Sequence, residues 1–549
     1  MRLFYSRQKE MFFCFPKKQE EKSIVKKAGL KKNPYNQDMW QSKDFYVVAD
    51  LVKFAEGKIK EKIETKLREF EQAIVESRST EADIKIPAPK GLEYRPFQKA
   101  GIAFSLKRSH TLNADDMRLG KTIQAIGHIN YRYKSGTAKI LIICPATIKL
   151  NWYEELKKWL VNKRLSIKVI SSKSYIKANI QIINYDILKK WEEKLKQQEW
   201  DLLIADEAHK LKNMASKRTQ IVFGAKNKKP IACKEMLLLT GSPIVNRPNE
   251  LYSLLKALKT PFVKNYNEFI ERYMEREFNG FGWAFKGGKN LNELQHKLRQ
   301  TVMIRRKKAD VFQDLPTKTR QIITLPEDTF LNVLLKEKVA VEKIEREKKK
   351  LEENVIAEKH SEKGYEEAVK KLRKFEGASM SEMAILRHFT AMAKLKDVVA
   401  HCETLLETEE KIVVYAHHVD LIKGLEENFK KYNPVVLYGA IKVEERMSLV
   451  KEFNQNKERR VCIIGIMLAQ GMSLASADVG VFAELDWVPG NISQAEDRLF
   501  DMSKNNPILI QHIVIDGSID SNLAKTLIEK QEIIDKSLDQ KFIEEEKNA

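Results

Sequence analysis

The chain has 549 residues, enough for several domains of about 100–200 residues each. Its 98 Lys and Arg outnumber its 76 Asp and Glu, which leaves a formal net charge of +22. With 43% hydrophobic residues, wholesale disorder is excluded. No apolar run approaches the ~20 residues that span a bilayer, and charges interrupt the first residues, so neither a membrane span nor a signal peptide is expected. The positive excess indicates a polyanionic partner, either nucleic acid or an anionic membrane.

The cysteines predict a reducing compartment. They are five in number, widely spaced, and none belongs to a C-x-x-C pair. A disulfide framework and a zinc ribbon are therefore not expected, and the protein is predicted to be intracellular.

Residues 1–85 are predicted to form a small basic N-terminal module. A basic, strand-like run (21–32) leads into a turn at 33–36, and a charged helix is expected from Asp50 to Ser77. Tyr35 and Trp40 lie among lysines, a combination that suits stacking on an unpaired base beside a phosphate. The alternative, that Trp40 is a core residue and the lysines are merely solvated, stays open.

Two regions alternate apolar strand-like runs with helical stretches. In the first, the runs are 139–145, 180–185, 201–207 and 235–241. In the second, they are 411–416, 433–439, 461–466, 479–485 and 508–515. Such alternation predicts an α/β fold of two parallel-sheet lobes with helices on both faces. The intervening residues, 251–400, are predicted to be mostly helical and charged, with a solvated protrusion around Lys336–Lys374.

The segment LNADDMRLGKTIQAI (112–126) has the end of a phosphate-binding loop. Gly120 and the backbone N–H groups at a helix start suit phosphate oxygens, Lys121 suits the β and γ phosphates, and Thr122 suits magnesium. The strict form of this loop begins with glycine, where this chain has Asp115. By itself the GKT is weak evidence.

A pair of carboxylates follows an apolar strand in LLIADEAHK (202–210). Residues at the carboxyl end of a parallel strand lie where ligands bind in open α/β sheets. Asp206 is predicted to hold hydrated Mg²⁺, and Glu207 to orient or deprotonate the attacking water. Together with GKT, DEAH favours an ATPase. Upstream, the amide of Gln98 suits adenine, because it offers both a donor and an acceptor.

These residues together resemble a Swi/Snf-type DNA translocase of helicase superfamily two, over about Leu92 to Ser537. The matching segments follow the family's order: 95–101, 114–122, 143–152, 183–188, 206–209, 239–251, 470–490 and 494–498. The joining segment 290–320 also matches, and FAELDWVPGNISQAEDR (482–498) is most similar to the annealing-helicase (HARP-type) branch. The front module loosely resembles the HARP module, which recognises forked DNA.

The resemblance implies two RecA-like lobes with helical insertions and a small accessory module. Lobe 1 is expected over 86–315, with an insertion at about 245–315, and lobe 2 over 316–549, with a protrusion at about 328–400. ATP and Mg²⁺ would bind between the lobes. Phosphate-loop contacts are assigned to Asp116, Leu119, Gly120, Lys121 and Thr122; from lobe 2, Gln494 opens the final motif, and Arg498 approaches the γ-phosphate. Candidate DNA contacts are Thr147, Asn184, Tyr185, Tyr438, Gly439, Gln470 and Gly471, beside Tyr35 and Trp40.

The chain departs from the family pattern at two places. The family usually has glycine at Arg118, whose side chain could face solvent, add a cation near the phosphates or exclude a competing partner. The family's second arginine in the final motif is replaced by Asp501, and Ser503 and Lys504 replace Gly-Gln. Lys504 is a candidate substitute cation. An arginine stabilising phosphoryl charge is worth ~10³–10⁵ in rate, so Asp501 bears directly on turnover.

The sequence thus predicts a DNA-dependent ATPase, acting as a monomer, that translocates on duplex DNA and remodels or reanneals forked DNA in replication, repair or recombination. The main alternative is an ATP-binding DNA clamp with weak hydrolysis, because of Asp501. An RNA helicase is a further alternative, disfavoured by the joining segment 290–320. A chromatin remodeller is another, disfavoured because no sequence resembles a histone-reading module.

Overall fold

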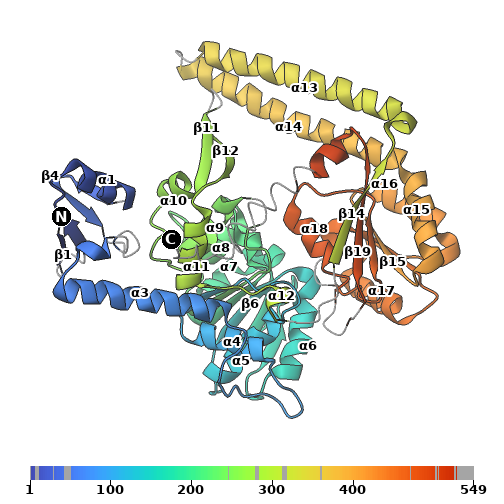
Figure 1. The fold of residues 1–549 in the computed structure, drawn as a ribbon. Coiled ribbons are helices and arrows are strands. Elements are labelled where there is room, and N and C mark those ends of the chain that lie inside the picture. The colour runs from blue at the N-terminus through green and yellow to red at the C-terminus, as the bar shows by residue number, and fades with distance from the viewer. Residues whose placement is uncertain are drawn as a thin grey trace, which may run out of the picture.

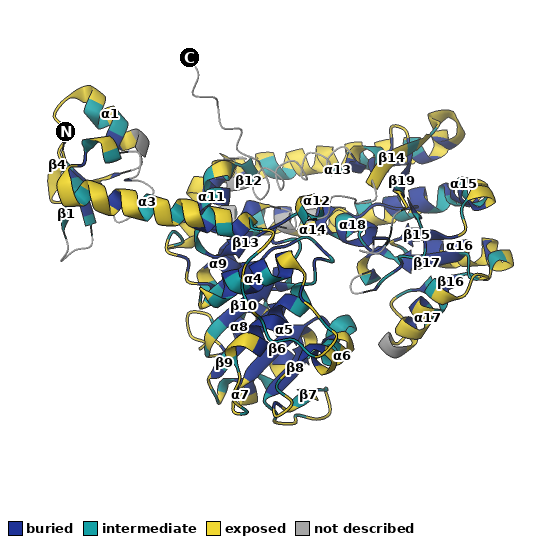
Figure 2. Cartoon of the chain, turned by 60° about the horizontal axis from the view of Figure 1, so that its bottom comes forward, coloured by how far each residue is buried: buried dark blue, intermediate teal, exposed yellow. Residues whose placement is uncertain are grey.

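The computed structural model describes residues 2–6, 11–28, 30–42, 48, 51–244, 247–278, 283–311, 318–358, 362–469, 472–500, 504, 506–524 and 527. Two α/β lobes lie side by side, a small module extends from one of them, and a long helical hairpin crosses above (Figure 1). The inner strands of both lobes are buried, whereas the long helices are largely exposed (Figure 2). No helix among the described residues is long and apolar enough to cross a membrane.

Lobe 1 is built on a seven-stranded parallel sheet of order β13-β5-β10-β9-β6-β8-β7. Its strands are β5 (His110–Asn113), β6 (Ile140–Cys144), β7 (Ile167–Val169), β8 (Ile180–Asn184), β9 (Trp200–Asp206), β10 (Cys233–Leu239) and β13 (Met303–Ile304). Its helices are α4 (Pro96–Leu106), α5 (Lys121–Arg132), α6 (Lys149–Trp159), α7 (Leu188–Lys196) and α8 (Lys217–Phe223). An apolar core covers each face of the sheet, as expected for runs of Ile and Leu buried on both sides.

Lobe 2 repeats this plan with a six-stranded parallel sheet of order β14-β19-β18-β15-β17-β16. Its strands are β14 (Lys318–Leu325), β15 (Ile412–Ala416), β16 (Val435–Leu437), β17 (Val461–Gly465), β18 (Val479–Phe482) and β19 (Ile508–Ile515). Its helices include α15 (Leu395–Thr408), α16 (Val419–Asn428), α17 (Val443–Gln455) and α18 (Pro489–Glu496). The predicted α/β fold with two parallel sheets is confirmed, and each strand-like run of the sequence contains a strand.

The region between the sheets is less uniformly helical than its composition predicts. It contains α9 (Leu251–Ala257), α10 (Tyr266–Tyr273), α11 (Leu291–Thr301) and α12 (Lys308–Val311), and then α13 (Leu331–Ala357) and α14 (Glu362–Ala393), which pack side by side. An antiparallel hairpin, β11 (Met274–Phe278) and β12 (Trp283–Gly288), stands between α10 and α11. The expectation of a mostly helical region holds for 251–400, but the sequence analysis did not predict this hairpin, because the charged residues of β11 obscure its short alternation.

The N-terminal module is a four-stranded antiparallel sheet of order β1-β2-β4-β3, with one helix against it. The elements are β1 (Leu3–Ser6), β2 (Met11–Cys14), α1 (Gln19–Ala28), β3 (Lys31–Asn33) and β4 (Asn36–Ser42). The strand-like prediction for 21–32 is therefore wrong for most of its length, which is helical. The long helix α3 (Gly57–Arg78), predicted from charge periodicity, then runs to lobe 1, where the Ser77 hydroxyl donates to the Met303 carbonyl at 2.7 Å.

Candidate nucleotide site between the lobes

The phosphate-loop segment joins β5 to α5 at the carboxyl edge of the lobe 1 sheet. Gly120 is the N-cap of α5 and has a φ of 69°, in the left-handed region that favours glycine. A Cβ at this position would lie 2.5 Å from Nε2 of Gln98. The backbone therefore favours glycine, and a larger residue would displace the amide of Gln98, whose Oε1 accepts from the Arg95 N–H at 3.0 Å. The predicted adenine residue therefore lies beside the loop.

Asp115 is not a phosphate ligand in this arrangement. Its carboxylate is fully buried and ion-paired with Arg306, whose Nε donates to Oδ1 at 2.9 Å. Gln124 donates to Oδ2 at 2.9 Å. Where the strict loop has glycine, this chain therefore has a buried ion pair that ties the loop to the segment after β13. Arg306 escaped the sequence analysis, and the RRKK run in the joining segment was its only signal.

Lys121 lies at the centre of converging acidic groups. Its Nζ donates to the carbonyls of Asp115 (2.8 Å) and Asp116 (3.0 Å). Burial lowers the pKa of Lys121, while the charges of Glu207, Asp115, Asp206 and Asp116 act to raise it. Thr122 follows in the first turn of α5, and Leu119 is buried below the loop. The predicted lysine thus sits where it can neutralise an anion beside the two carboxylates.

Asp206 ends β9, and Glu207 follows with a φ of 50°. Asp206 accepts from Trp152 Nε1 at 2.8 Å and from the Glu207 N–H at 2.9 Å. Burial and the neighbouring Glu207 charge raise the pKa of Asp206 to about 6. Burial acts to raise the pKa of Glu207, but His209, Lys121 and Arg498 outweigh it and lower the pKa to about 2.

Lobe 2 supplies Arg498 directly after α18. Its Nη2 lies 3.6 Å from Met117 Sδ in the phosphate-loop segment, and its Nε donates to the Gln494 carbonyl at 3.1 Å. Burial lowers the pKa of Arg498, and the charges of Glu207 and Asp497 act to raise it. Gln494 is also buried, at the base of this arginine. The structure therefore brings Arg498 of lobe 2 to the Lys121 and Glu207 side of the cleft.

The two departures from the family pattern have different outcomes. The guanidinium of Arg118 is turned toward lobe 2, where it hydrogen-bonds to Ser473 and to the carbonyls of Met472 and Arg498. Lys504 is ion-paired with Asp478 at 2.6 Å and donates to the Leu499 carbonyl at 3.1 Å, so it braces lobe 2 from within. This geometry does not support Lys504 as a substitute cation. Asp501 and Ser503 lie outside the described residues.

The candidate DNA contacts are only partly presented at the surface. Thr147 is half-buried, in the turn after β6. Asn184, at the end of β8, is buried, and its side chain accepts from Lys149 Nζ at 3.0 Å. Tyr185 is also buried and donates to the Asp206 carbonyl at 2.7 Å, so here it supports the strand end rather than offering a ring to DNA.

In lobe 2, Tyr438 is half-buried and Gly439 is exposed after β16, and the Gly439 carbonyl accepts from Arg446 at 2.9 Å. Gln470 and Gly471 lie outside the described residues. In the module, Tyr35 is 96% exposed at the hairpin turn, whereas Trp40 is 7% exposed within the core. Of the two alternatives for Trp40, the structure fits the core residue.

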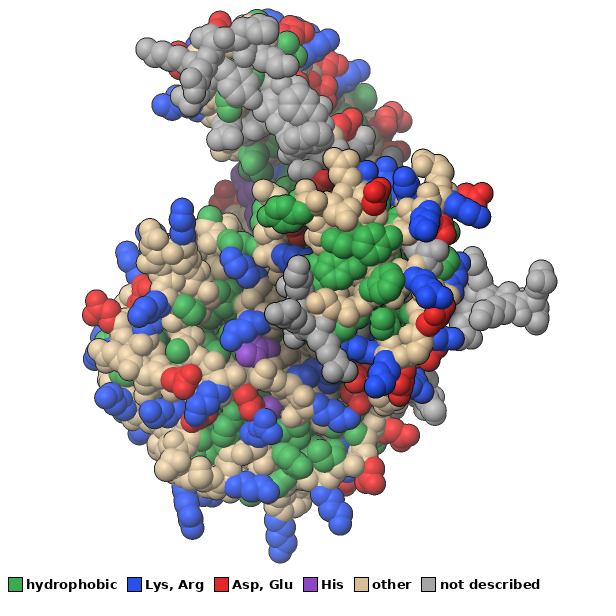
Figure 3. Space-filling view, turned by 90° about the vertical axis from the view of Figure 1, so that its left-hand side faces the viewer, with side chains coloured by type: hydrophobic (Ala, Val, Ile, Leu, Met, Phe, Trp, Pro, Cys, Tyr) green, Lys and Arg blue, Asp and Glu red, His purple; other side chains and the backbone are tan. Residues whose placement is uncertain are grey.

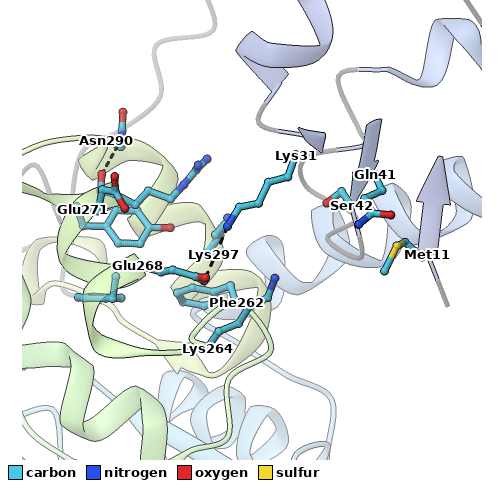
Figure 4. Close-up of a pocket in the computed structure, with 13 residues that line it drawn as sticks. Met11, Lys31, Gln41, Ser42, Phe262, Lys264, Glu268, Glu271, Asn290 and Lys297 are labelled. Atoms are coloured by element: carbon cyan, nitrogen blue, oxygen red, sulfur yellow. Dashed lines mark hydrogen bonds and ion pairs between the residues drawn. The ribbon is translucent and has the colours of Figure 1, made fainter. Parts of the chain in front are cut away.

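A cavity of about 600 Å³ separates the module from lobe 1. Figure 4 shows Lys31 reaching from the module toward Glu268 of α10, and the two pair at 3.6 Å. Lys264 and Lys297 also line the cavity. Elsewhere on the face that carries the module, Lys and Arg are spread over the surface rather than gathered into one patch (Figure 3).

Comparisons with known proteins agree on one family. Residues 97–388 match the SNF2-related domain, and residues 392–502 match the helicase conserved C-terminal domain. The SWI/SNF-related matrix-associated actin-dependent regulator of chromatin subfamily A-like protein 1 of Xenopus tropicalis is 30% identical over 84% of this chain and 47% of its own length. The human DNA annealing helicase and endonuclease ZRANB3 is 31% identical over 81% of this chain and 40% of its own length.

The chain thus spans less than half of these curated relatives. Among solved structures, the Sulfolobus solfataricus SWI2/SNF2 ATPase core in complex with dsDNA aligns with 84% of this chain and 100% of that chain, at 21% identity and a TM-score of 0.38.

Proposed function

Because the chain belongs to the SNF2-related family, we propose that it is a DNA-dependent ATPase that translocates on duplex DNA and remodels or reanneals forked DNA. One observation carries the proposal: Arg498 of lobe 2 enters the same cleft as Lys121 and Glu207 of lobe 1. A site divided between two lobes lets hydrolysis change the angle between them. Such a change of angle is the motion that a translocase needs.

The residues present fit ATP and Mg²⁺. Backbone N–H groups at the N-terminus of α5, which Gly120 caps, suit phosphate oxygens, and Lys121 supplies a cation beside them. Thr122 and Asp206 offer the hard oxygen ligands that Mg²⁺ prefers. When bound, Mg²⁺ would neutralise phosphate charge. Glu207, kept ionised by His209 and Arg498, would accept a proton from the attacking water, and Arg498 would stabilise charge on the γ-phosphate.

The DNA part of the proposal is supported by charge and by relatives. The net charge of +22 suits a polyphosphate track. ZRANB3 is named as an annealing helicase. We assign residues 1–85 to an accessory module, 86–315 to lobe 1 and 316–549 to lobe 2, and we assign fork recognition to the module, where Tyr35 is exposed. The proposed setting is intracellular and DNA-associated.

ATP turnover with forked DNA, linear duplex, single-stranded DNA, RNA and no nucleic acid tests the proposal. We expect fork and duplex to stimulate turnover, and Lys121→Ala or Glu207→Gln to lower it roughly 10³-fold, within the range for loss of a catalytic acid or base. Lys157→Ala removes a lysine of α6 that is exposed and serves as the matched control. Turnover that DNA leaves unchanged, or that survives both substitutions, would refute the proposal.

The alternative of an ATP-binding clamp with weak hydrolysis gains no support from these relatives. Lys121, Glu207 and Arg498 lie close enough in the cleft for their charges to interact, which supports hydrolysis.

A further inference from the structure

Arg118 occupies a backbone position that favours glycine. Its φ is 68°, in the left-handed region where a side chain is strained. Such a residue persists only where its surroundings hold it. The reason for an arginine at this point of the phosphate-loop segment should therefore lie in what its side chain contacts.

The guanidinium of Arg118 crosses the cleft to lobe 2. Nη1 donates to Ser473 Oγ at 3.0 Å, and Nη2 donates to the carbonyls of Met472 (3.1 Å) and Arg498 (3.3 Å). These bonds span more than 350 residues of sequence, and a charged donor makes each stronger than a neutral bond.

The acceptors are themselves fixed within lobe 2. The Arg498 carbonyl also accepts from the Leu474 N–H at 2.9 Å, and the Ser473 carbonyl accepts from Asn454 at 2.7 Å. The groups that accept hydrogen bonds from Arg118 are therefore held in place by other hydrogen bonds within lobe 2. In return, the Arg498 side chain reaches Met117, the neighbour of Arg118, so the two segments hold each other across the cleft.

A second link joins the same two segments. Lys308 Nζ pairs with Asp497 at 2.9 Å, and the Lys308 N–H donates to Asp116 Oδ2 at 3.1 Å. Asp116 and Arg118 of the phosphate-loop segment are therefore connected to Asp497 and Arg498, which are consecutive in lobe 2.

From these contacts we propose that Arg118 is a positioning residue: it holds Arg498 in register with the phosphate loop and keeps the two lobes together before nucleotide or DNA binds. The consequence for turnover rests on the proposed ATPase function, whereas the consequence for lobe geometry does not.

The lobe geometry is tested by energy transfer in the full chain without nucleotide or DNA. Dyes are placed on cysteines at two exposed positions, Lys163 in lobe 1 and Glu426 in lobe 2, with Cys233 replaced by Ser. We expect Arg118→Gly, which fits the backbone, to give longer and broader interlobe distances, and Ser473→Ala to give an intermediate result. Ser476→Ala is the matched control, because its buried hydroxyl has no hydrogen-bond partner among the described residues. An Arg118→Gly distribution equal to that of the parent would overturn the proposal.

Turnover supplies the second readout. With saturating DNA, Arg118→Gly should lower kcat roughly tenfold, the effect of losing a charge-assisted hydrogen bond, while KM for ATP changes less than about threefold. Arg118→Lys should recover part of kcat. A raised KM with unchanged kcat would place Arg118 on the nucleotide and overturn the positioning role. If the parent shows no DNA-stimulated turnover, the proposed function fails. The distance measurement still tests whether Arg118 holds the two lobes together.

Discussion

The nucleotide cleft and the N-terminal module carry charge in opposite ways. In the cleft, Asp115 and Arg306 are both fully buried and held by several partners. In the module, the Lys31 side chain is 76% exposed and Tyr35 is 96% exposed at a hairpin turn. A buried charge costs far more to leave unpaired than an exposed one. Substitution of the buried pair in the cleft should therefore destabilise the fold, whereas substitution of these exposed residues of the module should change only binding.

Asp115→Ala should have the largest effect on stability. It leaves the Arg306 guanidinium buried without its carboxylate, and breaking such a pair costs roughly 3–5 kcal/mol. We expect the low end, about 3 kcal/mol, because the carbonyls of Phe97 and Ser79 still accept from Arg306. Urea unfolding followed by tryptophan fluorescence measures the change. Asp83→Ala, at an exposed position, should leave the midpoint unchanged. An equally small change in the urea midpoint for Asp115→Ala and Asp83→Ala would show that the buried pair does not stabilise the fold more than an exposed charge does.

Glu484→Gln tests whether lobe 2 relies on a buried carboxylate in the same way. Glu484 Oε2 accepts from the backbone N–H groups of His417 (2.7 Å) and His418 (2.9 Å), which joins the segments after β15 and β18. Burial acts to raise the pKa of Glu484, but the bonds and charge of His418 outweigh it and lower the pKa from 4.5 to about 2. The folded state therefore gains stability from the carboxylate above pH 4.5 and loses that gain as the pH falls toward 2.

We expect Glu484→Gln to lower the free energy of unfolding by about 2 kcal/mol at neutral pH, since one pKa unit corresponds to ~1.4 kcal/mol and glutamine keeps part of the hydrogen bonding. The difference from the parent should shrink at about pH 3. Urea unfolding at both pH values measures it. If the difference in unfolding free energy between Glu484→Gln and the parent stays constant with pH, it arises from packing and not from the charge of Glu484.

Local patterns in the sequence were enough to predict both sheets. A short run of Ile and Leu such as 139–145, bounded by polar and turn residues, is typical of a strand that is covered on both faces of a parallel sheet, and β6 is such a strand. Lys121, Asp206 and Glu207 were found because each follows a strand end or starts a helix. The hairpin β11–β12 was missed, because charged residues such as Glu275 and Glu277 obscure its alternation.

Contacts between distant segments were beyond sequence reasoning. Arg118 and Ser473, 355 residues apart in the sequence, meet only because the two lobes face each other. Local sequence could not show whether Trp40 faces solvent or the core, since one register of β4 decides it. Tyr185 matched a strand-end pattern, but its hydroxyl is bonded beneath Asp206.

Tyr35→Ala should have the smallest effect, because it removes an exposed ring from the module. Loss of one base-stacking contact costs roughly 1 kcal/mol, so affinity for forked DNA should fall about fivefold, with kcat on linear duplex unchanged. Tyr35→Phe keeps the ring and is the matched control. The point substitution is easier to interpret than removal of residues 1–85. That deletion would also remove the contacts of Ser77 and Ser79 with Met303 and Arg306 of lobe 1. Fork and duplex affinities that fall equally in Tyr35→Ala would show that the module contributes general charge rather than fork recognition.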